Sequence, residues 1–363
     1  MRDRVKRIVP IVLLAAACAG MWFLPGPRKL ADAGGETSRA EVLEVDDSGL
    51  QLHGLVEFGT QKLKVRLPDG SIRAAHNEIR AQKELDKKFK VGDTALMILG
   101  SDPLIARDHW RIGWMSVLFG GFALLLVAFG GWTGAKALFS FVFSCFAVWK
   151  LLIPLCLSGW RAGWTSLAVV SVLTAVIMYL VAGATRKGLA AFFGALLGVM
   201  ASLALADFFA AVMHVNGATM PFVQTLLYSG YVDLDIADVF IGSVILASSG
   251  AVMDLAMDIA AAAEEVARHN PGLSRRELLL SGLRVGRSVV GTMTTTLLLA
   301  YSGGYLTLLM VFAAQGTHPA DFINSTLVSA EIVKTLVGSF GLVLVAPFTA
   351  AVAAVAYGKG FKV

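Results

Sequence analysis

Two carboxylates stand four residues apart in a stretch where charged side chains are costly. Asp254 and Asp258 follow an apolar run, and only 15 residues separate Asp238 from Asp254. A spanning helix needs about 20 apolar residues, so the run must carry Asp254 into the membrane. Residues i and i+4 of a helix are neighbours, which places Asp258 one turn further along the same face and closer to the interface. A carboxylate inside the bilayer predicts a proton or cation site facing the bundle interior; the alternative is a group that is paired, or hydrated from the inner surface.

Four threonines cluster in a second apolar stretch. Arg284 and Arg287 open this stretch, and Gly291 comes directly before the threonines. Threonine hydroxyls hydrogen-bond their own helix backbone or reach a neighbouring helix. If they face Asp254 they line a hydrated proton path, and otherwise they hold helices together; the sequence leaves both interpretations open. The four residues are Thr292, Thr294, Thr295 and Thr296.

The other ionisable groups near apolar runs are further candidates. Lys150 interrupts such a run one turn before Pro154, and it either pairs with an intramembrane carboxylate or extends its ammonium group to the surface. Glu331 and Lys334 precede 24 residues that can span alone, so we expect them as a pair at the outer surface. The secondary candidates for a coupling site are Asp207, Arg287, Glu331 and Lys334.

The elements that must position these residues are membrane-spanning helices. The chain of 363 residues is 56% hydrophobic and 16% charged, whereas a soluble domain has roughly a quarter of its residues charged. Charge-poor windows of spanning length occur eight times, so we expect an all-α polytopic bundle of about eight transmembrane helices. The predicted spans are Ile8 to Leu24, Ile112 to Ala135, Ala137 to Leu157, Ala162 to Thr185, Gly188 to Ala206, Val239 to Ile259, Ser288 to Ala320 and Thr335 to Gly358.

The first span has two interpretations. Four basic residues precede its apolar run, as in a signal peptide or an uncleaved anchor. Ala31-Asp32-Ala33 resembles a cleavage site, but Arg28 and Lys29 separate it from the apolar run, which favours an anchor. Either form leaves the orientation of the following chain unchanged.

A polar island follows the first span. Residues 28–111 hold 14 of the 31 lysines and arginines. Apolar and polar residues alternate in 50–53 and 63–67, as in half-buried strands, and Pro68-Asp69-Gly70 supplies turn residues. We expect a small β-rich, barrel-like extracytoplasmic domain between the first two helices. The predicted organisation is an anchor at 1–27, this domain at 28–111 and a seven-helix transmembrane domain at 112–363.

The distribution of basic residues among short loops predicts the orientation. With the N-terminus inside, fourteen lysines and arginines lie in the inner loops and termini, and only Arg161 and Lys334 lie in the outer short loops. We therefore expect both termini in the cytoplasm, in a bacterial inner membrane. The net charge of +5 mostly follows from this asymmetry, and no nucleic-acid partner is expected.

Other chemistries leave no mark in the sequence. Cys18, Cys145 and Cys156 all lie in apolar runs without metal-binding spacing, and packing explains them. The sequence contains no phosphate-binding loop, zinc motif or nucleophile elbow. We expect no cofactor, no metal and no enzymatic activity. A metal between Asp254 and Asp258 is the remaining enzymatic alternative, for which the ligand count is too low.

With these residues in place, the chain resembles the YibE/F family of bacterial multi-pass membrane proteins over nearly its whole length. The similarity includes the N-terminal helix, a β-rich domain that ends in Lys90-Val91-Gly92-Asp93, and the helical remainder. The resemblance implies a membrane protein but no particular activity. Its most specific stretches are Ala247 to Asp258, Gly286-Arg287 with Gly291-Thr292-Met293, and Ser329-Ala330-Glu331-Ile332-Val333-Lys334.

The last three predicted helices are also similar to those of SecF and its relatives among the resistance–nodulation–division transporters. In that group an aspartate-bearing helix is followed by a basic cytoplasmic loop, a threonine-rich helix and a final helix rich in small residues. Here Asp254, the loop from Glu264 to Arg287, and Thr292 to Thr296 occur in the same order. This chain departs from SecF in its two additional helices and its small outer domain. The likeness is an analogy at the level of fold and favours a transport mechanism.

Two functions from different classes follow. The first is a proton- or ion-coupled transporter or export-assisting protein, with Asp254 as the protonatable centre whose charge biases two packing states. The second is a non-transporting membrane scaffold or accessory subunit whose outer domain binds an unidentified protein. The lipid bilayer is the one partner that the sequence predicts. The sequence indicates no substrate and no oligomeric state.

Overall fold

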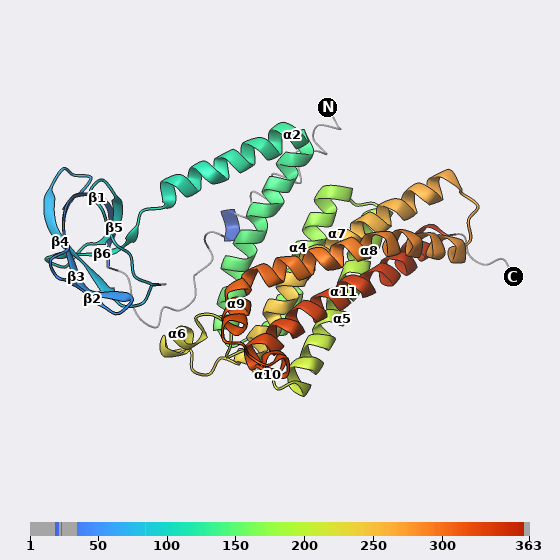
Figure 1. Ribbon diagram of the computed structural model, residues 1–363. Helices are drawn as coiled ribbons and strands as arrows, with labels where there is room; N and C mark the ends of the chain where they lie inside the picture. The colour runs from blue at the N-terminus through green and yellow to red at the C-terminus, as the bar shows by residue number, and fades with distance from the viewer. Residues whose placement is uncertain (1–18, 22, 24–34, 84, 359–363) are drawn as a thin grey trace, which may run out of the picture. The chain divides into compact units, whose positions relative to one another are not determined.

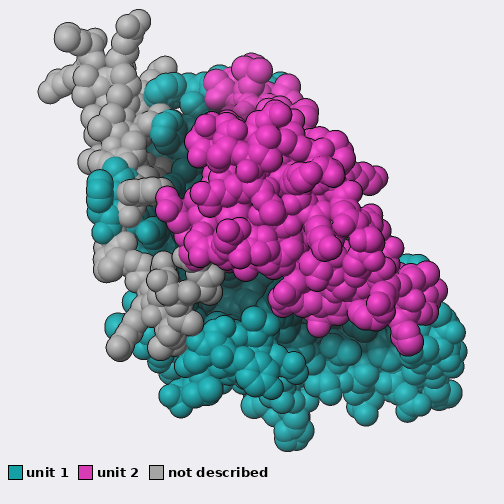
Figure 2. All heavy atoms as spheres, turned by 90° about the vertical axis from the view of Figure 1, so that its left-hand side faces the viewer, with its two compact units in different colours: residues 1–28, 129–363 teal, residues 29–128 magenta. Residues whose placement is uncertain are grey.

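The computed structural model describes residues 19–21, 23, 35–83 and 85–358 (Figure 1). The chain divides into two compact units, one of residues 29–128 and the other of residues 129–363 together with 1–28 (Figure 2). All described strands belong to the first unit, and the second is helical. Most of the predicted first span, Ile8 to Leu24, lies outside the described residues, so the anchor stays a prediction.

Six strands form the barrel of the first unit, which also contains residues 112–128 of a long helix. In β3, Gln61, Leu63 and Val65 are buried, whereas the basic residues between and after them are exposed. This period of two is that of a strand with one face on a core, so the alternating sequence pattern predicted this strand correctly. The strands are β1 (Thr37–Asp46), β2 (Leu50–His53), β3 (Val56–Arg66), β4 (Ile72–Arg80), β5 (Thr94–Ile98) and β6 (Leu104–His109).

The strands close into a barrel. Their order is β1-β5-β6-β4-β3-β2, and β1 also pairs with β3, so five strands form a ring to which β2 adds as a hairpin on β3. The first half of β1 pairs with β5 and the second half with β3. Numbered without β2, the ring runs 1-2-3-5-4-1, and its third and fifth strands (β4 and β6) are parallel. This is the topology of the OB-fold, a small Greek-key barrel, and it confirms the expected barrel-like domain.

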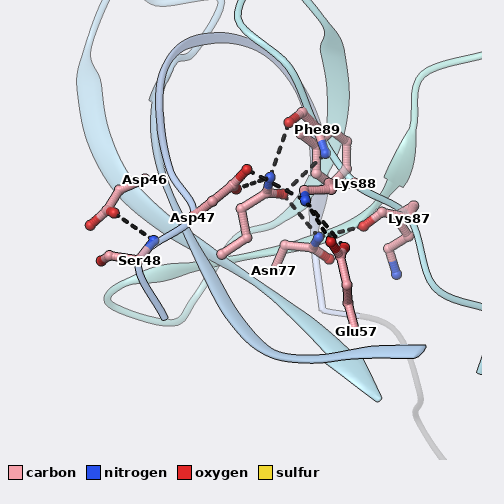
Figure 3. Close-up of polar contacts among 9 residues, drawn as sticks. Asp46, Asp47, Ser48, Glu57, Asn77, Lys87, Lys88 and Phe89 are labelled. Carbon is pink, nitrogen blue, oxygen red and sulfur yellow. Dashed lines mark hydrogen bonds and ion pairs between the residues drawn. The ribbon is translucent and has the colours of Figure 1, made fainter. Parts of the chain in front are cut away.

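The barrel interior contains a polar cluster centred on Gln61, whose side chain is fully hydrogen-bonded. Gln61 is completely buried, and its amide nitrogen donates to Asp47 Oδ1 (2.7 Å) and to the carbonyl oxygen of Phe89 (3.0 Å). Its oxygen accepts from the backbone N–H of Phe89 (3.0 Å) and from Asn77 Nδ2 (3.2 Å). The cluster therefore ties β3, β4 and the segment around Phe89 together (Figure 3).

Ion pairs cover the outer face of the barrel. Lys64 Nζ lies 2.6 Å from Glu44 Oε2, and Lys88 Nζ lies 3.1 Å from Glu57 Oε2. The hydrogen bond with Glu57 raises the pKa of Lys88. All four side chains are largely exposed, so water screens these pairs and each contributes little to stability.

The second unit is a bundle of long helices. Within α2, Gly131 has a φ of 53°, which interrupts the helix. Glycine adopts this left-handed φ without steric cost, so the chain turns here and not at Lys136, where the sequence suggested a break between two spans. The helices are α2 (Ile112–Ala147), the π-helix η1 (Val148–Leu152), α3 (Ile153–Leu157), α4 (Ala162–Ala182), α5 (Arg186–Val212), α6 (Val223–Tyr228), α7 (Ile236–His269), α8 (Arg275–Gly304), α9 (Leu306–Ala314), α10 (Pro319–Asn324) and α11 (Thr326–Tyr357).

The described residues include five helical stretches that are long and apolar enough to cross a membrane, or six if the bent pair α8 and α9 counts as one span. The longest stretch, Ile112–Leu157, has 46 residues. At 1.5 Å per residue it is about twice as long as the hydrocarbon core is thick, so it has room for the two spans predicted within it. The predicted total of about eight helices is not confirmed. The other single stretches are Ala162–Ala182, Arg186–Val212, Ile236–His269 and Thr326–Tyr357.

Helix contacts in the bundle are made by small residues. Gly194 of α5 lies against α11, where an added Cβ would come within 2.7 Å of the Cα of Thr349. Gly198 and Gly341 continue this contact, the second of them against Ser202. Around it, α7 packs on both α5 and α11, α8 packs on α7 and α11, and α4 packs on α5 and α7. Lipid tails are as apolar as leucine, so close backbone approach, and not the hydrophobic effect, holds such helices together.

The helix α7 extends beyond its predicted span. The span predicted from the sequence ends at Ile259, whereas the helix continues to His269. Arg268 Nη2 lies 2.7 Å from Glu265 Oε1 one turn earlier, and such i,i+3 pairs support a helix after its apolar part has ended. A search for apolar windows stops at these charges and therefore underestimates the helix.

The helix α8 also differs from its prediction. The sequence indicated one span from Ser288 to Ala320. The helix instead begins at Arg275, where Ser274 and Glu277 form a capping box, a motif that satisfies the free N–H groups of a first turn. It ends at Gly304, and α9 follows at an angle of 67°.

Candidate functional site

Asp254 and Asp258 lie near the middle of α7. Asp254 stands 18 residues after Ile236 and 15 before His269, the two ends of the helix. Both carboxylates are exposed at the surface of the helical unit, so in this single chain they face outward and not into the core, where Val252 lies. Neither carboxylate forms a hydrogen bond or an ion pair within the described part of the chain.

The threonines of α8 lie level with Asp254. Ile259 of α7 contacts α8 at Gly282 and Gly286. A five-residue connection joins the two helices, so they run antiparallel. Asp254, five residues before Ile259, is therefore level with the start of the threonine cluster at Thr292. All four hydroxyls donate to carbonyl groups of their own helix, over 2.7 to 3.2 Å, and all but Thr294 are exposed.

The outward faces of α7 and α8 thus carry polar groups within the long apolar part of the bundle. Arg287 is also exposed on α8, one turn before Gly291. An ionised carboxylate at mid-bilayer costs at least about 2.5 to 3.5 kcal/mol. Inside the hydrocarbon core, Asp254 would therefore have to be neutral, or be covered by water or another molecule. Among the described residues, no group of three or more His, Cys, Asp and Glu side chains could hold a metal.

Lys150 lies in a different part of the bundle. It belongs to η1, which packs on α4, and α4 in turn packs on α7. Its ammonium nitrogen is 5.0 Å from the centre of the Trp149 ring. The helix is π-helical here, and Pro154 follows in the first turn of α3. Proline removes a backbone hydrogen bond, which accounts for the π-helical distortion before it.

Glu331 and Lys334 belong to a partly buried group with two tyrosines, which we call the tyrosine cluster (Tyr301, Tyr305, Glu331 and Lys334). Lys334 Nζ donates to the hydroxyl of Tyr305 over 3.2 Å and lies 5.8 Å from the centres of both tyrosine rings. Glu331 Oε2 and the hydroxyl of Tyr301 are buried and have no partner among the described residues. Tyr305 sits at the bend between α8 and α9. The sequence had placed Glu331 and Lys334 as a simple pair at the outer surface.

Asp207 lines a cavity of about 390 Å³ that we call the Arg161 cavity. The cavity lies where α4 and α7 begin and α5 ends. A second carboxylate in it, Asp238, is buried; its Oδ2 accepts from the N–H of Gly163 (3.2 Å), and Arg161 Nη2 lies 4.0 Å from its Oδ1. In the sequence, Asp238 marks only the boundary of a predicted span, and Arg161 bears only on the predicted orientation. The one signal that could have identified this site was the position of both charges at the edges of apolar runs.

A charged contact closes the opposite end of the bundle. Lys187 Nζ of α5 lies 3.1 Å from Glu264 Oε2 of α7, and the hydroxyl of Tyr357 of α11 donates to the other oxygen over 3.2 Å. Arg186 donates to the carbonyl oxygen of Ala356 over 3.4 Å. Three helices that pack through small residues are thereby joined by polar contacts where their apolar parts end.

Long apolar helices that pack through glycine and alanine, with ion pairs beyond their apolar parts, define an integral membrane protein. Residues 118–359 match the family model described as YibE/F-like protein. This match covers well over half of the chain, and the chain belongs to the YibE/F family, as the resemblance predicted. No curated protein and no solved structure matches the chain. The likeness to SecF is not confirmed.

Proposed function

We propose that this protein is a proton- or cation-coupled membrane transporter or export-assisting protein, with Asp254 as its coupling group. One observation carries the proposal: the carboxylate lies halfway along a helix of spanning length, and it has no partner within the described chain. Intramembrane carboxylates of this kind mark ion pathways and proton relays.

The physical reason is that the two charge states of Asp254 require different surroundings. The neutral acid tolerates contact with lipid or apolar protein, whereas the carboxylate requires water, a cation or a hydrogen-bond donor. A group that gains and loses a proton therefore favours two different arrangements around α7, and the proton gradient can shift the balance between them. Asp258, about 6 Å further along the axis, provides a second proton acceptor on the same face.

Polar groups continue from Asp254 toward both ends of the bundle. Toward one end, Glu264 follows on the same helix at about 15 Å along the axis. Toward the other end, α7 contributes the buried Ser248. A Cβ added at Gly338 would lie 3.4 Å from the Cβ of Ser248 and 3.3 Å from the hydroxyl of Tyr301, so these residues lie close together. The tyrosine cluster, with its unpartnered carboxylate oxygen, supports an entry point at that end.

The proposal includes an orientation. The bias of basic residues between loops supports cytoplasmic termini in a bacterial inner membrane, with the barrel on the outer side. A single reporter cysteine at Lys62 of β3, in a chain without its three native cysteines, should react with a membrane-impermeant maleimide in intact spheroplasts. A cysteine at Arg268 should react only after the membrane is opened. The reverse pattern would contradict this orientation.

The coupling role can be tested by proton flux. The full chain is reconstituted in liposomes that contain a pH-sensitive dye, and a potential is imposed with potassium and valinomycin. We expect flux above that of empty liposomes, and Asp254→Asn should lower it roughly a hundredfold, which is a typical effect of removing a proton-transfer group.

Glu265→Gln is the matched control for this experiment. It removes a carboxylate from the same helix, but from an exposed pair with Arg268, so flux should be unchanged. Wild-type flux in Asp254→Asn, at equal incorporation into the liposomes, would show that Asp254 has no coupling role.

A scaffold function is the second candidate, and the hairpin at the edge of the barrel favours it. Leu52 and Leu55 are 73% and 88% exposed. Among the described strands β2 pairs with β3 alone, and no described strand covers its other edge. Exposed apolar side chains beside an unpaired edge are typical of binding surfaces. Leu55→Asp should abolish the capture of a protein partner and leave proton flux intact. Unchanged capture would argue against this surface.

A further inference from the structure

The Arg161 cavity changes in polarity along the helix axes. Leu167 lies six positions after Arg161, the residue that caps α4, and Asp207 lies seven positions after Met200 on α5. At 1.5 Å per residue, the polar and apolar ends of the cavity are about 9 to 10 Å apart. Leu203 lines the cavity with them. A site that is charged at one end and aliphatic at the other matches an amphiphile that lies parallel to the helices.

The two carboxylates at the polar end of the cavity differ in their partners. Asp238 is already satisfied by the N–H of Gly163 and by Arg161. Asp207 also lines the cavity, and it has no hydrogen bond or ion pair with any described residue. With one guanidinium and two carboxylates, the lining carries a net charge of −1. A positively charged group would therefore bind favourably beside the carboxylate of Asp207.

The remaining polar-end residues narrow the chemistry of that group. Trp164 stands one turn after Arg161, between the charged and the aliphatic residues, and indole faces attract ammonium groups. Arg161 is 69% exposed beyond its contact with Asp238, so it keeps N–H donors for a phosphate oxygen. An ammonium beside Asp207 and a phosphate beside Arg161 would both find partners.

We propose that the Arg161 cavity binds an amphiphile with an ammonium head group, whose head meets Asp207 and Trp164 and whose chain lies along Leu167 and Leu203. Phosphatidylethanolamine fits best, because its phosphate also meets Arg161. This site is separate from Asp254, and its occupancy does not depend on proton coupling.

Two variants isolate the proposed contacts. Asp207→Asn keeps the shape of an exposed side chain and removes its charge. Ala204→Phe fills the cavity from its exposed rim and keeps every charge. Asp233→Asn is the matched control, since Asp233 is an exposed aspartate in the connection before α7 and does not line the cavity.

The experiment is native mass spectrometry of the full chain in a neutral maltoside detergent. The probes are phosphatidylethanolamine, phosphatidylglycerol, dodecylamine and dodecanol. We expect an amine-bearing probe to be retained at one copy per chain and to bind at least about tenfold more weakly to Asp207→Asn, because that variant removes one charge-assisted hydrogen bond. Ala204→Phe should lower retention as well, and Asp233→Asn should not.

The probes also distinguish the source of the ligand. Retention of phosphatidylethanolamine identifies a bilayer lipid, whereas retention of dodecylamine alone identifies a free amphiphile; both support the site. Equal retention of phosphatidylglycerol and phosphatidylethanolamine, or of dodecanol and dodecylamine, would overturn the proposal. Wild-type retention in both Asp207→Asn and Ala204→Phe would overturn it too. None of these outcomes bears on proton flux, so the site and the coupling role are tested independently.

Discussion

The barrel core and the contact between α5 and α11 are built from different side chains. The barrel core contains Phe89, Met97 and Leu104, all nearly fully buried. The contact between α5 and α11 instead contains small residues such as Gly194 and Gly341. The barrel folds through the removal of apolar area from water, which rewards large side chains. The bundle lies in a solvent that is itself apolar, so close contact between backbones takes that role.

Buried polar groups occur in both units. Gln61 in the barrel uses its nitrogen and its oxygen in four hydrogen bonds, which indicates a role in stability. Both units also keep buried polar atoms without a partner among the described residues: His76 Nδ1 and Asn77 Oδ1 in the barrel, and Glu331 Oε2 and the hydroxyl of Tyr301 in the bundle. Unpartnered buried atoms therefore do not distinguish the two interiors.

Removal of the cation from the tyrosine cluster should have the largest effect. Lys334→Ala leaves Glu331 half-buried without its basic neighbour, and we expect a loss of about 3 kcal/mol in the free energy of unfolding. Adding Glu331→Gln to the same chain should restore most of it, because no unpaired charge then remains. Thermal unfolding of the detergent-solubilised chain measures both changes. A double variant that is no more stable than Lys334→Ala would mean that Lys334 does not serve to neutralise Glu331.

The polar cluster of the barrel should come next. Gln61→Ala removes the side-chain partner of two backbone groups of Phe89, whereas Asn77 Nδ2 keeps its bond to the carbonyl oxygen of Lys87. We expect a loss of about 3 kcal/mol or less in the free energy of unfolding. Hydrogen exchange in the full chain should speed up in the peptide that contains Phe89. Gln51→Ala, at an exposed position of β2, is the control and should change nothing. Unaltered exchange in Gln61→Ala would remove the structural role assigned to this cluster.

Adding one methyl group to each of two glycines should change the free energy of unfolding in opposite directions. Gly194→Ala should destabilise the bundle by about 1 to 3 kcal/mol, because the new Cβ meets the backbone of Thr349. Gly250→Ala, on the open face of α7, has no atom within 4 Å of its new Cβ, so helix propensity should stabilise it by up to about 1 kcal/mol. Unfolding midpoints of the two variants measure the difference. A stabilised Gly194→Ala would refute the close contact.

The surface of the barrel should give the smallest effect. A double-mutant cycle with Glu44→Ala and Lys64→Ala should report a coupling energy below about 1 kcal/mol, because both side chains are exposed. Added salt should reduce the coupling further. A coupling energy as large as that between Lys334 and Glu331 would contradict the expectation that exposed charges of the barrel interact more weakly than the partly buried charges of the tyrosine cluster.

Local sequence patterns predicted the elements better than their connections. Alternation identified β3, because each strand's period is a property of neighbouring residues. The closure of the ring could not be predicted in this way, since the pairing of Glu41 with Arg66 joins residues 25 positions apart. Charge-poor windows located α4, α5 and α7. They missed the break at Gly131, because a backbone dihedral angle leaves no trace in hydropathy.

The candidate site was predictable to the same extent. The spacing of Asp254 and Asp258 placed them one turn apart on a helix, and they lie so on α7. The sequence did not predict that this face points outward, because that depends on which helices pack against α7. It also missed the meeting of Tyr301 with Glu331, which belong to different helices, and the burial of Asp238.

The glycine contacts between α5 and α11 have a mechanical consequence. Thr349 and Val345 of α11 lie against Gly194 and Gly198 of α5, and Ser202 of α5 lies against Gly341 of α11. Each helix therefore places side chains in the hollows that the glycines of the other leave, and packed interiors of this kind resist small deformations. The two helices are thereby held in one axial position, so a force on one of them is passed to the other.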